Sequence, residues 1–143
     1  MKKIFLDTNI VLDFLGEREN FYDAAAKLLT LADQKKILVY TSPTSISNAF
    51  YILAKYENSK IALEKIRKFK VLCNISIMNN EVVERAINSD FKDFEDGMQY
   101  FSAIAEKCEI IITRNEKDFK NAMIPVMNAD SFLQMIKNKI DIK

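Results

Sequence analysis

The stretch from Lys3 to Leu15 reads KIFLDTNIVLDFL and decides which class of fold this chain can adopt. It begins with a short apolar run, passes through a polar triplet that starts at Asp7, and ends in apolar residues at helical spacing. A short apolar run before a polar turn is typical of a buried strand, and apolar residues three or four positions apart indicate a helix. The pattern therefore predicts a buried strand, a polar turn and a helix that ends near Gly16.

The same alternation of strand and helix continues along the chain. Apolar runs predict strands at 37–41, 71–75 and 109–113, and a weak edge strand at 124–127, where Pro125 suits an edge. Helices are predicted from a cap at Asn20 to Lys36, from a cap at Ser42 to about 54, and over 59–70, 80–89 and 130–139. A further helix is predicted from about Phe91 or Phe94 to Lys107. Strands joined through helices favour a parallel sheet that is covered on both faces. We therefore expect one α/β domain over residues 1–143, with three α/β/α layers around a central, mainly parallel sheet.

The composition agrees with one compact domain. The 143 residues are 49% hydrophobic and include only two glycines and two prolines, which argues against disorder and long linkers. Cys73 and Cys108 are isolated in apolar surroundings, so we expect reduced, buried thiols. Asp7 interrupts the N-terminal apolar run, and no apolar stretch approaches the roughly 18–20 residues that cross a bilayer. We expect a cytoplasmic protein without a membrane segment.

Charge and the missing histidines narrow the chemistry. The net charge is +1, from 21 basic and 20 acidic residues, which is less basic than usual for a nucleic-acid module. The chain has no histidine. This excludes Ser-His-Asp and Cys-His triads, histidine acid–base catalysis and the common zinc sites. Carboxylates are the main catalytic groups that remain.

Acidic and polar residues follow the predicted strands. In open parallel sheets, ligands bind beyond the carboxyl ends of the strands. A polar triplet at residues 7–9 follows the first strand, residues 42–48 follow the second, and residues 113–118 follow the long apolar strand. Groups that are far apart in sequence are thus expected to meet at one edge of the sheet.

The helix near residue 96 is expected to bring further carboxylates. Phe94, Met98 and Phe101 would form its buried stripe, while Asp93 and Asp96 share a different face. Gly97 costs about 1 kcal/mol in a helix interior relative to alanine. Its lack of a side chain would leave room beside Asp96 for backbone or ligand.

Converging carboxylates need a counter-charge. Two unit charges about 4 Å apart repel by roughly 4 kcal/mol at an effective dielectric constant of 20. Oxygen ligands without His or Cys suit Mg²⁺ or Mn²⁺, which can activate water and neutralise a phosphodiester. Hydrolysis of a nucleic-acid backbone is a coherent hypothesis. Each acid also has a structural explanation: Asp7 and Asp118 as caps of a helix or turn, and Asp93, Glu95 and Asp96 as partners of a helix dipole.

Three segments together resemble a known family. The segments IFLDTNIVLD at 4–13, FEDGMQYFSA at 94–103 and IITRNEKDF at 111–119 resemble the acidic motifs of PIN domains in order and spacing. The single-domain VapC-type toxins of prokaryotic toxin–antitoxin pairs are the nearest look-alikes. The resemblance implies a five-stranded parallel sheet, a metal-dependent endoribonuclease site with RNA as substrate, homodimers, and inhibition by a small antitoxin.

The resemblance also implies roles for individual residues. Asp7, Asp96 and Asp118 would be the catalytic metal ligands for Mg²⁺ or Mn²⁺, with Asn115 as a neighbour of Asp118 or its substitute. Asn9 and Thr113 would support the site through hydrogen bonds. The candidates for substrate contact are Thr8, Thr44 and Arg114.

One position departs from the family pattern. The family usually has a glutamate early in the helix after the second strand, and here the counterpart is Asn48. An amide oxygen can coordinate a metal or orient water, but it brings no negative charge, so weaker metal binding is expected. Glu95 or Asp93 would compensate if either points inward.

Two other classes of function remain open. Asn48 and the near-neutral charge also fit a non-catalytic PIN-like module that binds RNA or a protein. Phosphoryl transfer by a haloacid-dehalogenase-like or receiver-type domain fits less well, because Asn9 stands where the former needs a second aspartate. Four aromatic residues, Phe21, Tyr51, Tyr56 and Tyr100, could stack on bases or fill core and dimer contacts, and the sequence favours the latter.

Overall fold

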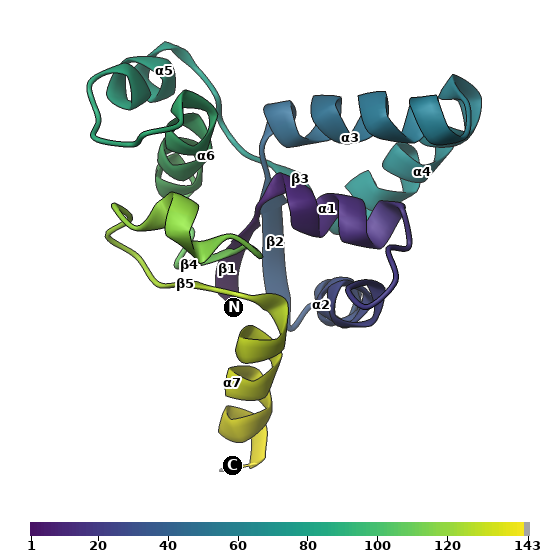
Figure 1. Cartoon of the computed structure of the whole chain (residues 1–143). Helices are drawn as coiled ribbons and strands as arrows, with labels where there is room; N and C mark the ends of the chain where they lie inside the picture. The colour runs from purple at the N-terminus through teal and green to yellow at the C-terminus, as the bar shows by residue number, and fades with distance from the viewer. Residues whose placement is uncertain (142–143) are drawn as a thin grey trace.

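The central element is a five-stranded, all-parallel sheet with the strand order β3-β2-β1-β4-β5. A computed structural model describes the backbone of residues 1–141 and the side chains of residues 1–138 (Figure 1). The strands are β1 (Lys2–Leu6), β2 (Ile37–Thr41), β3 (Asn74–Ile75), β4 (Ile110–Ile112) and β5 (Val126–Met127). The predicted parallel sheet, its five strands and the edge position of the last strand are confirmed.

Helices cover both faces of this sheet, which confirms the predicted α/β/α layering. They are α1 (Thr8–Leu15), α2 (Tyr22–Asp33), α3 (Pro43–Tyr56), α4 (Ser59–Leu72), α5 (Asn80–Ile87), α6 (Phe94–Ala105) and α7 (Ala129–Asp141), with a short 3₁₀ turn, η1 (Glu116–Phe119). In Figure 1, α1 to α4 gather on one side of the strands, and α5 and α6 lie on the other. No helix in the described part of the chain is long and apolar enough to span a bilayer.

The two faces of the sheet carry separate apolar cores because strand side chains alternate in direction. Ile4 and Leu6 of β1 pack into a core shared with α1, α2, α3, α4 and α7. Phe5, between them, packs into a second core with Tyr100 of α6 and Phe119 of η1. The near-continuous apolar strands are thus explained by burial on both faces. Both cysteines are free and buried, as expected.

Two local predictions are wrong. Asn20 does not cap α2: the cap position is Phe21, with no side-chain hydrogen bond, and Asn20 instead has a positive φ of 74°. The strand predicted over 71–75 is reduced to Asn74–Ile75, because α4 continues to Leu72. Its apolar residues serve helix packing up to that point, and a short apolar run does not distinguish helix from strand.

The buried face of α6 also differs from the prediction. Phe94 is 47% exposed, whereas Gln99, Tyr100 and Ala103 are buried. The helix has apolar residues on both sides, so periodicity alone selected the wrong stripe. Gln99 is tolerated in the interior because its amide is hydrogen-bonded on both sides.

Gly97 makes room for protein and not for a ligand. A Cβ atom at this position would lie 3.3 Å from Cβ of Phe91 and 3.5 Å from Cβ of Ala86 on α5. The glycine therefore allows α6 to approach α5 and the segment between the two helices.

This contact predicts the effect of substitutions at Gly97. Gly97→Ala should change the free energy of unfolding by less than about 1 kcal/mol, because the gain in helix propensity offsets a tight contact. Gly97→Leu should lower it by about 1–3 kcal/mol through overpacking. Urea unfolding of both variants measures this, and a leucine variant as stable as the alanine variant would contradict the packing.

Candidate functional site at the carboxyl edge of the sheet

The candidate site is built where β1, β2 and β4 end. Asp7 directly follows β1 and caps α1, and Ser42 directly follows β2 and caps α3. Thr113 directly follows β4. Their backbones are joined across the edge by bonds such as Asp7 N–H to Ile112 O, 3.0 Å. The parallel register thus brings three distant segments to one place.

Asp7 is the centre of this arrangement, and it is only 6% exposed. One oxygen, Oδ1, accepts hydrogen bonds from Thr8 N (2.8 Å) and from Gln99 Nε2 (3.2 Å). The other, Oδ2, accepts from Thr113 Oγ1 at 2.8 Å. Three donors from α1, α6 and the β4 end therefore fix the direction of this carboxylate.

A chain of buried hydroxyl groups supports Gln99. Ser42 Oγ donates to Ser45 Oγ (3.1 Å), and Ser45 Oγ donates to Gln99 Oε1 (2.9 Å). Thr8 Oγ1 lies 2.7 Å from Ser45 Oγ. Because the Ser45 hydroxyl has one proton, the Thr8 hydroxyl is the donor in that pair. The hydrogen bonds donated by Ser42 and Thr8 to Ser45 therefore continue through Gln99 to Asp7, and each donor points along the chain towards Asp7.

Burial and like charges oppose ionisation at this edge. Burial raises the pKa of Asp7, the hydrogen bonds from Thr113, Thr8 and Gln99 lower it, and the Asp118 charge raises it. The pKa of Asp96 is raised to about 7, first by burial and then by the charges of Asp93, Asp118, Asp7 and Glu95. Asp7, Asp96 and Asp118 are thus close enough to interact electrically, although they lie 22 to 111 positions apart in the chain.

The outer acids reach the site from two elements. Asp96 lies in the first turn of α6, and the exposed Asp118 lies on η1, which packs against α6. Asp93 caps α6 by accepting from Asp96 N at 3.0 Å. Asn48 Nδ2 on α3 donates to Glu95 Oε1 on α6 at 2.8 Å. The amide that departs from the family pattern therefore holds a carboxylate across the site.

The other candidate residues are divided between the site and its surroundings. Asn115 N donates to Thr113 Oγ1 at 3.0 Å, so its backbone supports the Asp7 network. Asn9 is half-buried on α1. Thr44 Oγ1 donates to Met78 Sδ at 3.0 Å, which turns it towards the segment after β3. Arg114 turns away from the acids and pairs with Asp13 on α1.

The donor set fits Mg²⁺ or Mn²⁺ in an open site. All the acidic groups are hard oxygen ligands, and burial together with the charges of the neighbouring acids raises the pKa of Asp96. Among the described residues, no three Asp, Glu, Cys or His side chains converge as a ready-made metal cage. Mg²⁺ is commonly held by one or two carboxylates and several waters, so an incomplete cage matches its coordination.

With this geometry established, comparison with known proteins identifies the family. A model of the PIN domain matches residues 3–117. The chain belongs to the PIN domain family. The three motifs that suggested it lie on β1 and α1, on α6, and on β4 and η1, which are the elements that meet at the acidic edge.

The PIN domain's relatives include toxins. Ribonuclease VapC1 of Aquifex aeolicus is 29% identical over 138 residues, which cover 93% of this chain and 94% of that protein. A toxin–antitoxin complex from Klebsiella pneumoniae has a chain of the same fold, with a TM-score of 0.67, 22% identity, and 88% and 97% coverage of the two chains. Mycobacterium tuberculosis VapC20, described as a toxin that cleaves the sarcin–ricin loop, gives a TM-score of 0.59 and 15% identity, with 76% and 86% coverage.

Sequence reasoning missed Gln99 and Ser45. Both have polar side chains that are less than 3% exposed, and their hydrogen bonds connect α3 and α6 to Asp7. A glutamine within an apolar run is the one signal in the sequence, since an unpaired buried amide is costly and implies a partner.

The raised pKa of Asp96 predicts how stability depends on pH. Between the ordinary value of 3.8 and about 7, the folded protein holds a proton that the unfolded chain has lost. Without a divalent cation, stability should therefore fall as the pH rises through this window. Thermal unfolding from pH 4 to 8 in EDTA should show this slope, and Asp96→Asn should flatten it. A wild-type slope of the opposite sign, attributable to Asp96, would contradict the acidic clustering.

Proposed function

We propose that this PIN domain is a Mg²⁺- or Mn²⁺-dependent endoribonuclease, the toxin of a toxin–antitoxin pair, that hydrolyses RNA phosphodiester bonds. The observation that carries the proposal is the electrical coupling of Asp7, Asp96 and Asp118 at the carboxyl edge of the sheet. The similarity to Ribonuclease VapC1 over nearly the whole length of both chains supports the same activity.

In this proposal the chain's residues prepare a charged, oriented site. Asp7 offers a buried carboxylate whose two oxygens are already held by three donors. Asp96 and the exposed Asp118 complete the acidic face from α6 and η1, and Asp118 is open to water. A bound Mg²⁺ or Mn²⁺ would lower the pKa of a coordinated water and offset charge on the phosphodiester.

The fourth acidic contribution is proposed to come from Glu95. Asn48 stands where the resemblance leads us to expect a glutamate, and its amide N–H holds Glu95 Oε1 at 2.8 Å. The negative charge absent from α3 is thus supplied from α6, one residue before Asp96. Asn48 acts as the positioning residue for that carboxylate.

Partners are proposed from the same relatives. Similar solved structures include a toxin–antitoxin complex from Klebsiella pneumoniae, which supports an antitoxin as partner. A homodimer is proposed as the resemblance implies, and Tyr51, Tyr56 and Val71 on α3 and α4 are each more than three-quarters exposed. An RNA substrate would place the activity in the cytoplasm. A non-catalytic RNA- or protein-binding module is the second candidate, and Asn48 favours it.

Removing an acid should abolish cleavage if the proposal holds. Asp96→Asn should lower the rate of RNA cleavage in Mn²⁺ by about 100-fold or more, because it removes charge that acts on the reacting group. Asp33→Asn, an exposed acid at the end of α2, is the matched control and should cleave like the wild type. Labelled single-stranded RNA resolved on gels measures both rates. Equal cleavage by Asp96→Asn and wild type would reject the nuclease site, and a silent wild type would favour the non-catalytic module.

The role of Glu95 has its own test. Glu95→Gln should weaken Mn²⁺ binding by about tenfold, and the exchange variant Asn48→Glu with Glu95→Gln should recover it by returning the charge to α3. Isothermal titration with Mn²⁺ measures the affinity without any need for cleavage. If Glu95→Gln binds Mn²⁺ as tightly as the wild type, Glu95 is not part of the acidic face.

A further inference from the structure

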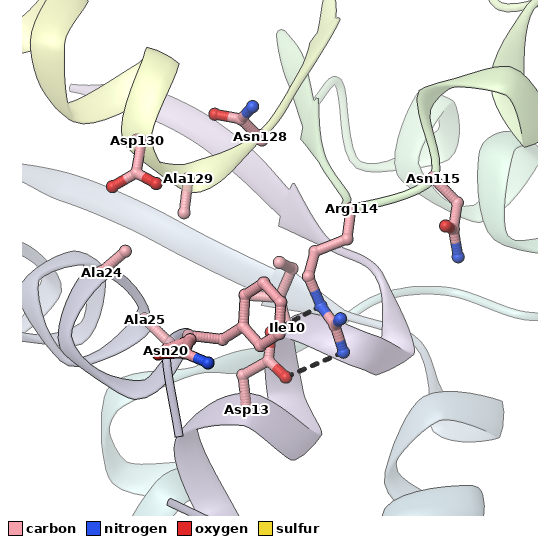
Figure 2. Close-up of a pocket in the computed structure, with 11 residues that line it drawn as sticks. Ile10, Asp13, Asn20, Ala24, Ala25, Arg114, Asn115, Asn128, Ala129 and Asp130 are labelled. Carbon is pink, nitrogen blue, oxygen red and sulfur yellow. Dashed lines mark hydrogen bonds and ion pairs between the residues drawn. The ribbon is translucent and has the colours of Figure 1, made fainter. Parts of the chain in front are cut away.

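A pocket lies beside the acidic edge, between α1, α2 and the start of α7. Its volume is about 290 Å³ (Figure 2). Its lining includes Ile10, Asp13, Asn20, Phe21, Arg114 and Asn128. Figure 2 shows Arg114 reaching across from the segment after β4 to Asp13 on α1, with Asn128 and Asp130 on the opposite wall.

The Arg114 guanidinium is held in this pocket by an ion pair and by an aromatic contact. Its Nε lies 3.0 Å from Asp13 Oδ2, and its NH2 donates to Asp13 Oδ1 at 3.1 Å, a two-point contact with a carboxylate that is 1% exposed. The guanidinium carbon also lies 3.9 Å from the ring centre of Phe21, in a stacked position. Planar guanidinium and aromatic groups are the surfaces on which nucleobases stack.

The charge in the pocket argues against a phosphate and favours a neutral ring. Arg114 and Arg18 both pair with Asp13, at 3.0 Å and 3.7 Å, and Asp130 adds a second negative charge to the lining, so the positive and negative charges around the pocket balance. A phosphate or an acidic peptide would therefore gain little attraction here. Ile10, Ala24 and Ala25 give the pocket an apolar wall against which a flat ring can pack.

Side-chain amides surround this flat surface. Asn20 and Asn115 line the pocket, and within residues 1–138 neither side chain forms a hydrogen bond. Asn128 Oδ1 accepts from Ser131 N at 2.8 Å, which leaves its amide N–H groups as donors. Amide groups offer both donors and acceptors, as the edge of a base requires.

The pocket and the proposed catalytic edge are built partly by the same segments, α1 and the residues after β4. Helix α1 starts directly after Asp7 and carries Ile10 and Asp13 into the pocket, a distance of about 9 Å along the helix. Asn115 belongs to the pocket lining, while its backbone N–H supports Thr113, the donor to Asp7. A chain that lies across the acids can thus reach the pocket with a neighbouring group.

We infer that this pocket, with its Arg114–Phe21 wall, binds an unpaired nucleobase of the RNA next to the bond at the acidic edge. The inference rests on the proposed function only for the identity of the polymer. Stacking on Phe21 and Arg114 provides the affinity, and the asparagine amides contact the edge of the base.

Binding of RNA under conditions without cleavage tests the inference. Fluorescein-labelled single-stranded RNA oligonucleotides, intact or with one abasic site moved along the strand, are titrated with protein in Ca²⁺ and followed by anisotropy. Phe21→Ala should weaken binding of intact RNA by about 5- to 150-fold, the range for loss of one stacked base. Arg114→Lys keeps the charge opposite Asp13 but loses the planar surface, so it should weaken binding in the same direction.

The abasic strands decide whether the lost contact is with a base. One abasic position should weaken wild-type binding as much as Phe21→Ala does, and the two changes together should cause no further loss. Ile87→Ala, which removes a 63% exposed apolar side chain at the end of α5, on the other side of the sheet, is the control and should bind like the wild type. Thermal unfolding should show Phe21→Ala folded, since its side chain is partly exposed.

Wild-type affinity of Phe21→Ala for intact RNA would overturn the inference, as would additive losses from Phe21→Ala and every abasic site. An effect of Phe21→Ala on antitoxin binding alone would assign the pocket to a protein partner and overturn it as well. Cleavage assays separate this result from the proposed function. If the protein cleaves RNA but Phe21→Ala binds RNA like the wild type, only the proposed base-binding pocket is rejected. If the protein binds the base but does not cleave RNA, only the proposed nuclease activity is rejected.

Discussion

The organisation of the site depends on one buried carboxylate that accepts three hydrogen bonds from three different elements. Asp7 receives Thr8 N from α1, Gln99 Nε2 from α6 and Thr113 Oγ1 from the end of β4. A buried acid without such donors would be costly and would remain protonated. The same bonds that keep Asp7 oriented therefore tie α6 and the β4 end to the first strand. Fold and candidate site share these contacts, so the acidic edge is also a structural joint.

The acids outside this joint are held differently, and the difference has a physical purpose in the proposed chemistry. Asp96 and Asp118 lie nearer to water. Burial first, and then the charges of Asp93, Asp118, Asp7 and Glu95, raise the pKa of Asp96 to about 7. Glu95 is kept near them by one amide of Asn48. A rigid inner carboxylate with adjustable outer ones suits a cation that exchanges waters and substrate oxygens. In the cation-free protein these carboxylates repel one another, and the same charges attract a cation.

Much of the fold could be predicted from the sequence because its signals are local. A short apolar run followed by polar residues, repeated along the chain, predicts parallel strands and the edge where Asp7 lies. The stripe of α6 could not be predicted, since apolar residues occur on both of its sides and the hydrogen bonds that bury Gln99 come from Ser45 and Asp7, distant in sequence. For the same reason the sequence could not show which acid compensates for the missing charge at Asn48, although Glu95 was one of the two acids considered. Arg114 was expected at the substrate, but its pairing with Asp13 depends on the packing of α1 against the β4 end. Roles that depend on long-range contacts need the coordinates.

The most direct test of the account is anomalous diffraction from crystals of the protein soaked with Mn²⁺. The account predicts a manganese peak at the carboxyl edge of the sheet, within coordination distance of oxygens from Asp7 and at least one of Asp96 and Asp118, directly or through one water. An acidic edge without a peak, in crystals that take up manganese elsewhere, would contradict the claim that these carboxylates act together on one cation.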